Sequence, residues 1–171
     1  MSEQLRRAAV LRSMTFSDLD DVVRVQEDGA VAGLGHIFPQ SRFPFPVDAI
    51  RSRWRSELSD PGTRCFVVLG DDRRVAGFAA VRGDEFLHFG TALDTWGTGL
   101  AGRAHDEVLA EFRADGHRSA RLRVFEANAR ARRFYERRGW APTGERSASP
   151  FAPHPILVGY RVELAEAERG E

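Results

Sequence analysis

The stretch that decides the fold is Leu122–Gly144, with the sequence LRVFEANARARRFYERRGWAPTG. Its first residues alternate between apolar and polar side chains, which predicts a strand that ends near Glu126. Asn128 is a favourable helix N-cap, and Gly139 lies where the following helix is expected to end. The segment therefore predicts a strand followed directly by a helix. The residues beyond it, up to the alternating run 156–164, predict a closing hairpin.

Upstream lies a second candidate strand–loop–helix unit, Asp94–Val108, with the sequence DTWGTGLAGRAHDEV. It contains Gly97-Thr98-Gly99-Leu100-Ala101-Gly102, a literal G-x-G-x-x-G that follows an apolar run and precedes a helical pattern. Glycines at such a place let a phosphate approach backbone N–H groups at the positive end of a helix dipole. A dinucleotide loop, a loop for another phosphate-bearing ligand and a plain glycine turn all fit this pattern.

The dinucleotide interpretation has one supporting feature, because Glu126 ends the next strand where a ribose-binding acid would lie. The rest of the chain argues against it. The 45 residues after Glu126 encode one helix and a hairpin, and the residues before Glu85 predict antiparallel strands. A doubly wound dinucleotide fold needs further parallel strand–helix–strand units, so this interpretation is not favoured.

Before Asp94 the chain predicts a strand over residues 8–15, two helices and a meander of three further strands. We expect Ser17 to cap the first helix and Val47 to begin the second, with an irregular Pro- and Phe-rich loop at Gly33–Pro46. The element order is β-α-α-β-β-β-α-β-α-β-β. It predicts an α/β protein with a mixed central β-sheet of about seven strands flanked by about four helices, in a single domain over residues 1–171.

The two strand–loop–helix units together resemble the GCN5-related N-acetyltransferase (GNAT) family. In that family the first unit carries [QR]-x-x-G-x-[GA], which corresponds here to Trp96–Ala101, with Trp in place of the usual Arg or Gln. The second unit carries N-x-x-A-x-x-x-Y followed by G-[FW], which corresponds to Asn128, Ala131, Tyr135, Gly139 and Trp140. Together with the element order, the resemblance covers about residues 8–164 and implies the acyl-CoA N-acyltransferase fold.

The resemblance implies transfer of an acetyl group from acetyl-CoA to a primary amine of a small molecule or peptide, by direct attack in a ternary complex. The pyrophosphate would lie on the N–H groups of Thr98–Arg103, and the pantetheine would run beside Thr91–Leu93 between two strands that splay apart. The implied coenzyme-binding residues are Thr91, Ala92, Leu93, Trp96, Gly97, Thr98, Gly99, Leu100, Ala101, Gly102, Arg103, Asn128, Arg132, Arg133 and Tyr135. A non-catalytic acyl-CoA-binding or regulatory module, and an O-acyl or longer-acyl transferase, are the alternatives.

Two residues are expected to take part in catalysis. The resemblance implies that Tyr135 donates a proton to the departing thiolate and that Glu85 takes one from the acceptor ammonium, whose pKa is about 10.4 in an alkylamine. His88 and a water relay are alternative bases. A backbone N–H near Leu93 is the expected oxyanion donor. Strict alternation along this strand predicts one face with Glu85, Leu87, Phe89 and Thr91 and another with Phe86, His88 and Gly90.

The acceptor pocket is expected between the loop Gly33–Pro46, the second helix and the loop Glu145–Pro155. These segments and the neighbouring strand supply an aromatic, weakly charged set: His36, Phe38, Phe43, Phe45, Trp54, His88, Phe151 and His154. Such a lining favours a small, partly apolar amine or a peptide N-terminus over a polycation. The sequence does not define the acceptor further.

Composition argues against several other classes. The 25 basic residues, all arginine, balance 25 acidic residues, so neither nucleic acid nor a membrane is an expected partner. The first 12 residues lack the apolar core of a signal peptide, and a cytoplasmic protein is expected, with a homodimer as a possible assembly. Cys65, the single cysteine, lies in the apolar run CFVVLG and is expected to be a buried thiol; the scattered histidines predict no metal site.

Overall fold

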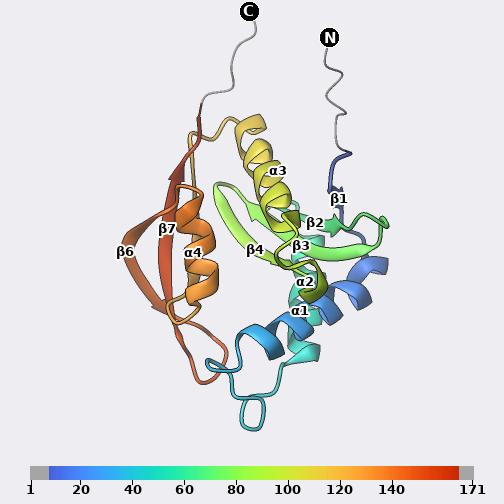
Figure 1. The fold of residues 1–171 in the computed structure, drawn as a ribbon, viewed down its shortest axis with the longest axis vertical. Coiled ribbons are helices and arrows are strands. Elements are labelled where there is room, and N and C mark those ends of the chain that lie inside the picture. Colours follow the sequence, from blue (N-terminus) through green and yellow to red (C-terminus); the bar gives the residue numbers. More distant parts are fainter. Residues whose placement is uncertain (1–7, 166–171) are drawn as a thin grey trace, which may run out of the picture.

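The computed structural model describes residues 8–165. Its strands form one seven-stranded sheet in the order β1-β2-β3-β4-β5-β7-β6 (Figure 1). The strands are β1 (Leu11–Ser13), β2 (Thr63–Leu69), β3 (Val75–Arg82), β4 (Glu85–Thr91), β5 (Ser119–Phe125), β6 (Ala141–Ala148) and β7 (Ile156–Glu163). The helices are α1 (Leu19–Gly33), α2 (Val47–Ser59), α3 (Leu100–Ala114) and α4 (Ala129–Arg137). The predicted α/β class with seven strands and four helices is confirmed.

The sheet consists of an antiparallel meander joined to an antiparallel C-terminal part through one parallel contact. Strands β1 to β4 pair antiparallel in chain order, as predicted. Strands β4 and β5 run parallel, because α3 carries the chain back across the sheet between them. Strand β7 then inserts between β5 and β6 and pairs antiparallel with both. The sheet is therefore mixed, and its central parallel contact lies at the start of β4, at the opposite end of this strand from the glycine-rich loop.

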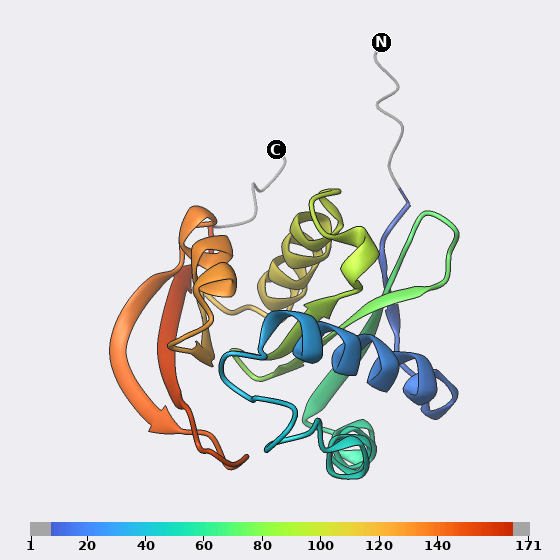
Figure 2. The same ribbon diagram turned by 60° about the horizontal axis from the view of Figure 1, so that its bottom comes forward.

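The helices cover the sheet from both faces. In Figure 2, α3 and α4 lie on one face and α1 and α2 on the other. The first face is closed by an apolar cluster around Phe86, Phe112 and Trp140, and the second by a cluster around Trp54 and Phe78. Amphipathic helices on both faces bury the two sides of the sheet, which explains the nearly continuous apolar runs of β2 and β3.

One irregularity in β4 corrects the predicted faces of this strand. Ala80 of β3 pairs with His88, but the next residue pairs with Phe86, so Leu87 is an extra residue in β4. Such a bulge interrupts the alternation of side chains. As a result Phe86 and Phe89 lie on the α3–α4 face, with their ring centroids 5.2 Å apart, while Leu87 and His88 both point toward α1 and α2.

Two local boundaries also differ from the sequence prediction. The N-terminal cap of the first helical segment is formed by Thr15 and Asp18, whose carboxylate accepts from the Thr15 N–H at 2.8 Å, and not by Ser17. The predicted loop from Glu145 is shorter than expected, because β6 continues to Ala148 by pairing with β7. Cys65 is buried as expected, and burial raises its thiol pKa to about 11.

The described part of the chain contains neither a membrane-spanning helix nor a cluster of metal ligands. Between residues 8 and 165, no helix is long and apolar enough to cross a bilayer. Within the same residues, no three His, Cys, Asp or Glu side chains are grouped so that they could hold a metal ion. The expectation for the N-terminal segment falls partly on residues 1–7, which lie outside the described residues.

Candidate functional site

The sheet opens between β4 and β5. These strands are paired only at Glu85–Arg121 and Phe86–Leu122, at the start of β4. From Leu87 to Thr91 the edge of β4 that faces β5 has no ladder partner within the described residues. Four strand steps at about 3.3 Å each make this open edge about 13 Å long. The bulge at Leu87 lies directly after the last paired residue, so the strands separate at the point where β4 changes its twist.

The glycine-rich loop closes the wide end of this opening and presents free backbone donors. Gly99 is the N-cap of α3 with a left-handed φ of 89°, and its carbonyl accepts the first helical bond from the Arg103 N–H at 3.1 Å. The amides of Leu100, Ala101 and Gly102 have no helical partner, but the Leu100 N–H donates to the Thr98 Oγ1 at 3.4 Å, which leaves those of Ala101 and Gly102 as the free donors. A Cβ placed on Gly97 or Gly99 would meet no atom within 4 Å, so open space lies over the loop. This end of α3 can receive an anion.

Three of the predicted phosphate-binding amides, that of Leu100 included, are already bonded within the protein. The Thr98 N–H donates to the Thr95 carbonyl at 3.2 Å, and the Arg103 N–H donates to Gly99. The donors available at the loop are accordingly fewer than the full run Thr98–Arg103. They concentrate in the first turn of α3.

Trp96 fixes the orientation of the loop. Its indole N–H donates to the Thr91 carbonyl at 2.9 Å, and the Arg130 guanidinium stacks on its ring with 3.3 Å between Cζ and the ring centroid. A Cβ on Gly33, at the end of α1, would lie 3.3 Å from the indole. Trp96 thus joins the loop to α4 and to α1. Arg130 was not among the predicted coenzyme residues, although its place in a basic helix beside the loop was visible in the sequence.

The three predicted phosphate-binding arginines lie in different surroundings. Arg103 donates to the Ala8 carbonyl at 3.3 Å, beside the start of the chain described here. Arg132 donates to the Tyr160 hydroxyl at 2.9 Å and to the Glu126 carbonyl at 3.0 Å, which anchors α4 to β7. Arg133 is exposed on α4. The structure brings none of these guanidinium groups onto the first turn of α3.

A different arginine covers the groove between α3 and α4. The Arg138 guanidinium lies 4.7 Å from the Phe134 ring centroid and 3.5 Å from the Asp106 carboxylate. A Cβ on Gly102 would collide with a terminal nitrogen of this guanidinium. Gly102 thus provides space for an arginine side chain as well as an amide. This contact could not be predicted from spacing, because it joins the end of one helix to the start of another.

The second motif is formed as the sequence predicts. The Asn128 Oδ1 accepts from the Ala131 N–H at 3.2 Å and caps α4. One face of α4 carries Tyr135 into the core beside Phe134 and Trp140, at ring-centroid distances of 5.4 and 5.9 Å. Burial raises the pKa of the Tyr135 phenol far above its usual value. The phenol is therefore protonated at neutral pH and can act as a donor.

The two candidate bases on β4 have unlike partners. Glu85 is paired with Arg121 at 2.9 Å and with Arg123 at 3.7 Å. It lies at the narrow end of the opening, where β4 and β5 are still paired. His88 bonds through Nε2 to the Glu57 Oε1 of α2 at 2.8 Å, and both side chains are about nine-tenths buried. Burial lowers the pKa of His88, and its bond to Glu57 opposes that effect. A neutral imidazole results, as a general base requires.

The predicted acceptor residues divide into three groups. Phe45, Trp54 and Phe151 pack in the cluster beneath α1 and α2, and the Trp54 ring lies 5.1 Å from that of His88. Two others line the junction of β5 and α4: His36 bonds the Ala127 carbonyl at 2.9 Å, and the Phe38 ring lies 5.4 Å from that of Phe125. Phe43 stacks only with Arg42, and His154 bonds the carbonyl of its own loop at Ser149. Trp54 is fully buried and is therefore a core residue.

Two charged residues of this region were missed by the sequence analysis. Glu57 and Arg53 lie one helical turn apart on α2 and face β4, where Glu57 Oε2 and Arg53 Nε are buried without a hydrogen-bond partner among residues 8–165. A signal was present in the sequence. Ile50, Trp54 and Glu57 follow the helical spacing of a buried face, so a carboxylate at the third position interrupts an apolar pattern.

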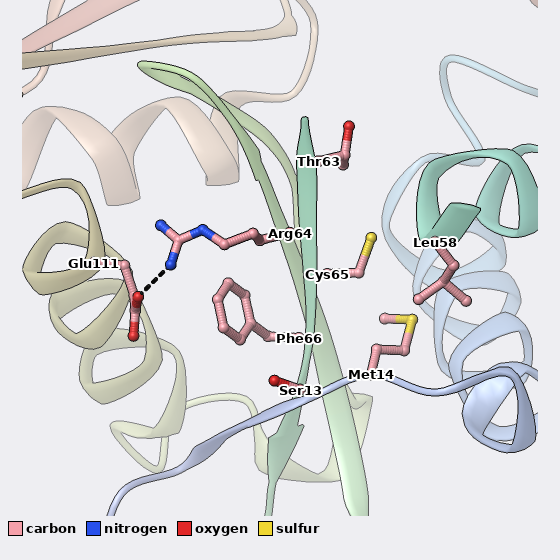
Figure 3. A pocket seen from close by; sticks show the side chains of 8 residues that line it. All are labelled: Ser13, Met14, Leu58, Thr63, Arg64, Cys65, Phe66 and Glu111. Carbon is pink, nitrogen blue, oxygen red and sulfur yellow. Dashed lines mark hydrogen bonds and ion pairs between the residues drawn. The ribbon is translucent and has the colours of Figure 1, made fainter. Parts of the chain in front are cut away.

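A separate pocket of about 370 Å³ lies at the other side of the sheet, near β1 and β2. Figure 3 shows its lining divided by β2, with Arg64, Phe66 and Glu111 on the α3 side and Met14, Leu58 and Cys65 on the α2 side. An ion pair of 2.6 Å joins Arg64 to Glu111. The pocket contains none of the predicted site residues, so the β4–β5 opening remains the candidate site.

Comparison with known proteins agrees with this geometry. A family model described as the acetyltransferase (GNAT) family matches residues 16–140. No curated protein is significantly similar in sequence.

Solved structures share the fold at low sequence identity. A GCN5-related N-acetyltransferase from Rhodopseudomonas palustris aligns with a TM-score of 0.72 and 14% identity, over 95% of this chain and 100% of the other. A GNAT-family acetyltransferase from Desulfovibrio desulfuricans has a TM-score of 0.68, 22% identity and coverages of 91% and 98%. Spermidine N-acetyltransferase from Vibrio cholerae, in complex with CoA and spermine, has a TM-score of 0.67, 15% identity and coverages of 90% and 94%.

Proposed function

Since the chain belongs to the GNAT acetyltransferase family, we propose that it transfers an acetyl group from acetyl-CoA to a primary amine of a small molecule or peptide. The observation that carries this proposal is the opening between β4 and β5, which ends at the free first turn of α3. One elongated ligand with an anionic end and an amide-rich arm fits both features. The reaction is a direct attack of the amine on the thioester, in a ternary complex.

The residues present suit the coenzyme. The amides of Ala101 and Gly102 would bind the pyrophosphate, and the open edge of β4 would bind the pantetheine amides as a neighbouring strand does. Asn128 caps α4 on the opposite side of the opening. Acetyl-CoA supplies the activated acetyl group. This chain's residues hold it at the opening and exclude water from it.

We place the proton acceptor at His88 in preference to Glu85. The Glu85 carboxylate is already engaged by two guanidinium groups, those of Arg121 and Arg123, so an acceptor ammonium would have to compete with them for its oxygens. His88 is two residues beyond the last β4–β5 pair, on the face opposite α3 and α4, and is held by Glu57. An acceptor that reaches the opening from the α1–α2 side would meet His88 first. The imidazole takes the ammonium proton before attack.

Tyr135 is the proton donor in this proposal. Its side chain belongs to the apolar cluster on the α3–α4 face of the sheet, whereas His88 points to the other face. Its raised pKa keeps the hydroxyl protonated when the thiolate departs. The thiolate is a fair leaving group with a pKa of about 8.5, so the donor assists the reaction and does not carry it alone.

A non-catalytic acyl-CoA-binding module is the second candidate function. It is favoured by the withdrawal of Arg103 and Arg132 from the loop, which leaves fewer cations for a tight polyphosphate site. Such a module would bind acetyl-CoA and CoA with equal affinity and would show no acceptor-dependent thiol release. An O-acyl or longer-acyl transferase would instead release thiol with hydroxyl acceptors or longer acyl chains.

A thermal-shift titration with acetyl-CoA, CoA and NADH tests the ligand, and thiol release over an amine panel tests the reaction. A ligand at 100 times its dissociation constant adds about 2.7 kcal/mol to the free energy of unfolding. We expect stabilisation by both CoA forms but not by NADH, and thiol release with at least one amine. The chain has no lysine, so acceptor-independent release is not self-acetylation of a side-chain amine. Stabilisation by NADH alone would refute the assignment.

The choice between the two bases has its own test. In the wild type, kcat/KM should rise with pH as the His88 imidazole loses its proton. His88→Gln should abolish this rise, and Glu85→Gln should leave it unchanged. Glu57, Arg53 and Arg82 also act on His88, so the profile is compared between variants under the same ionic strength. A profile lost in Glu85→Gln but kept in His88→Gln would reverse the assignment.

A further inference from the structure

Arg53 is a cation without an anionic partner in the part of the chain that the structure describes. No carboxylate of residues 8–165 lies within 4.0 Å of its guanidinium, whereas neighbouring Arg51 pairs with Asp20 at 2.6 Å. The Arg53 Nε is buried and unbonded. Its guanidinium lies 5.7 Å from the ring centroid of Phe151, in the β6–β7 loop. Burial lowers the pKa of Arg53, which reflects the cost of holding this charge away from water.

The Glu57 carboxylate, one helical turn away, compensates the charge of Arg53 only in part. Glu57 uses Oε1 for His88, and its Oε2 is buried and unbonded in the described structure. Arg82 is satisfied by Asp60 at 3.6 Å and by the Thr63 hydroxyl at 3.0 Å. An incompletely compensated guanidinium and an incompletely bonded carboxylate therefore lie side by side on α2. Buried groups of this kind are normally paired, so the arrangement indicates a ligand with complementary charges.

The position of this pair relates it to the proposed acceptor side. Arg53 and Glu57 are separated by four residues of α2, or about 6 Å along the helix axis. Glu57 is hydrogen-bonded to His88, which lies at the point where β4 leaves β5. One small molecule can therefore contact His88 with one end and Arg53 with the other. Phe151 would close over that molecule from the β6–β7 loop.

We propose that the acceptor is an amine that also carries a carboxylate, of the amino-acid class, and that Arg53 binds this carboxylate while the amine lies at His88 and Glu57. The inference rests on the proposed acetyl transfer and specifies its acceptor. The planar guanidinium suits a carboxylate, which can accept two parallel hydrogen bonds from it. The ammonium group of the acceptor would form an ion pair with the Glu57 carboxylate and would then transfer its proton to His88. A polycation would instead meet the positive charge of Arg53 and be disfavoured.

The test compares acids with their own amides. Wild-type protein, Arg53→Gln, Arg53→Lys and Arg55→Gln are assayed for thiol release from acetyl-CoA with each L-amino acid, with the corresponding L-amino-acid amide, and with spermidine. Arg55 is exposed on the same helix and serves as the matched control. The amide keeps the side chain of the acid and lacks its carboxylate charge; because its α-amine is also less basic, the acid-to-amide ratio of each variant is compared with that of the wild type at the same pH. Thermal stability of each variant is recorded, and Arg53→Lys retains the charge if Arg53→Gln fails to fold.

We expect wild-type protein to prefer at least one acid over its amide. Arg53→Gln should lower kcat/KM for that acid by about 10-fold or more, and should change that for the amide by less than about twofold. For the acid, the kcat/KM of Arg53→Lys should lie between those of the wild type and Arg53→Gln. Lysine keeps the positive charge but lacks the planar pair of N–H donors that a guanidinium offers to a carboxylate. Arg55→Gln should match wild type.

Three results would overturn the acceptor inference. Equal losses with acid and amide in Arg53→Gln would make Arg53 a structural residue. Preference of the wild type for amides or spermidine would exclude recognition of a carboxylate. Stabilisation by acetyl-CoA without acetylation of any amino acid would also exclude an amino-acid acceptor, but it would still support acetyl-CoA as the ligand. If acetyl-CoA neither stabilises the protein nor releases thiol with any amine, the proposed function itself fails.

Discussion

Replacement of Gly99 by alanine separates the strain of the loop from its role in binding. Gly99 has a φ of 89°, where an alanine is unfavourable by about 1–2 kcal/mol. The added Cβ would meet no atom within 4 Å, so backbone strain is the whole cost to the free protein. In a chain of this size that cost lowers Tm by roughly 2–8 °C. The methyl group would, however, occupy the open space over the first turn of α3, where a phosphate would lie.

Gly116 provides a matched control at the other end of α3. Its φ is 88°, and a Cβ there also meets nothing within 4 Å, so Gly116→Ala should lower Tm by a similar amount. Wild type and Gly116→Ala should both gain about 2.7 kcal/mol from acetyl-CoA at 100 times the wild-type Kd. If Gly99→Ala weakens binding tenfold, its gain at the same concentration falls to about 1.4 kcal/mol.

The assay is differential scanning fluorimetry across an acetyl-CoA series, with Kd measured independently by calorimetry. Equal acetyl-CoA affinity in Gly99→Ala and Gly116→Ala would refute the reasoning, since it would mean that no ligand atom approaches Gly99. A drop of Tm in Gly99→Ala without any drop in Gly116→Ala would show that the strain argument itself is wrong.

Other residues give further expectations. Tyr135→Phe should lower kcat by about 100-fold, the low end for general acid catalysis, and leave the Kd of acetyl-CoA unchanged; single-turnover kinetics with calorimetry check this. Arg130→Gln removes the guanidinium stacked on Trp96 and should lower the free energy of unfolding by about 0.5–2 kcal/mol, measured by urea titration. His105 is buried and accepts from the Trp140 indole at 2.9 Å, and burial lowers its pKa. The unfolded state therefore takes up the proton first, and stability falls as pH drops below about 6.5, by up to about 1.4 kcal/mol at pH 5.5. His105→Gln keeps an acceptor for the indole and should reduce that acid limb, to which His88 contributes in the same direction; a limb of unchanged size would exclude His105 as a source.

Much of the fold could be predicted because the information is local. The cap at Asn128, the break at Gly139 and the glycines of the loop each act within a few residues, and the structure places all of them where expected. The faces of β4 could not be predicted, because the extra residue Leu87 is defined only by its pairing with β3. The same bulge decides that His88 faces α2 and meets Glu57.

The candidate site likewise has parts that could be predicted and parts that could not. The spacing of neighbouring residues predicts the helix cap, the glycine-rich loop and the position of Tyr135. The contacts that orient them, Arg130 on Trp96 and Arg138 over Gly102, join segments about 35 residues apart and have no periodic signature. Long arginine side chains reach partners in any of several directions, so only the packed helices select one.

The sequence by itself determined the type and order of the elements, the family and the position of the glycine-rich loop, because turn chemistry, capping and hydrophobic period are properties of neighbouring residues. Only the tertiary structure decided that β7 inserts between β5 and β6, that β4 and β5 part after two residue pairs, and that Arg53 and Glu57 meet His88. These features depend on which distant surfaces bury each other. Burial is a property of the whole packed chain, and it cannot be assigned to any one segment of it.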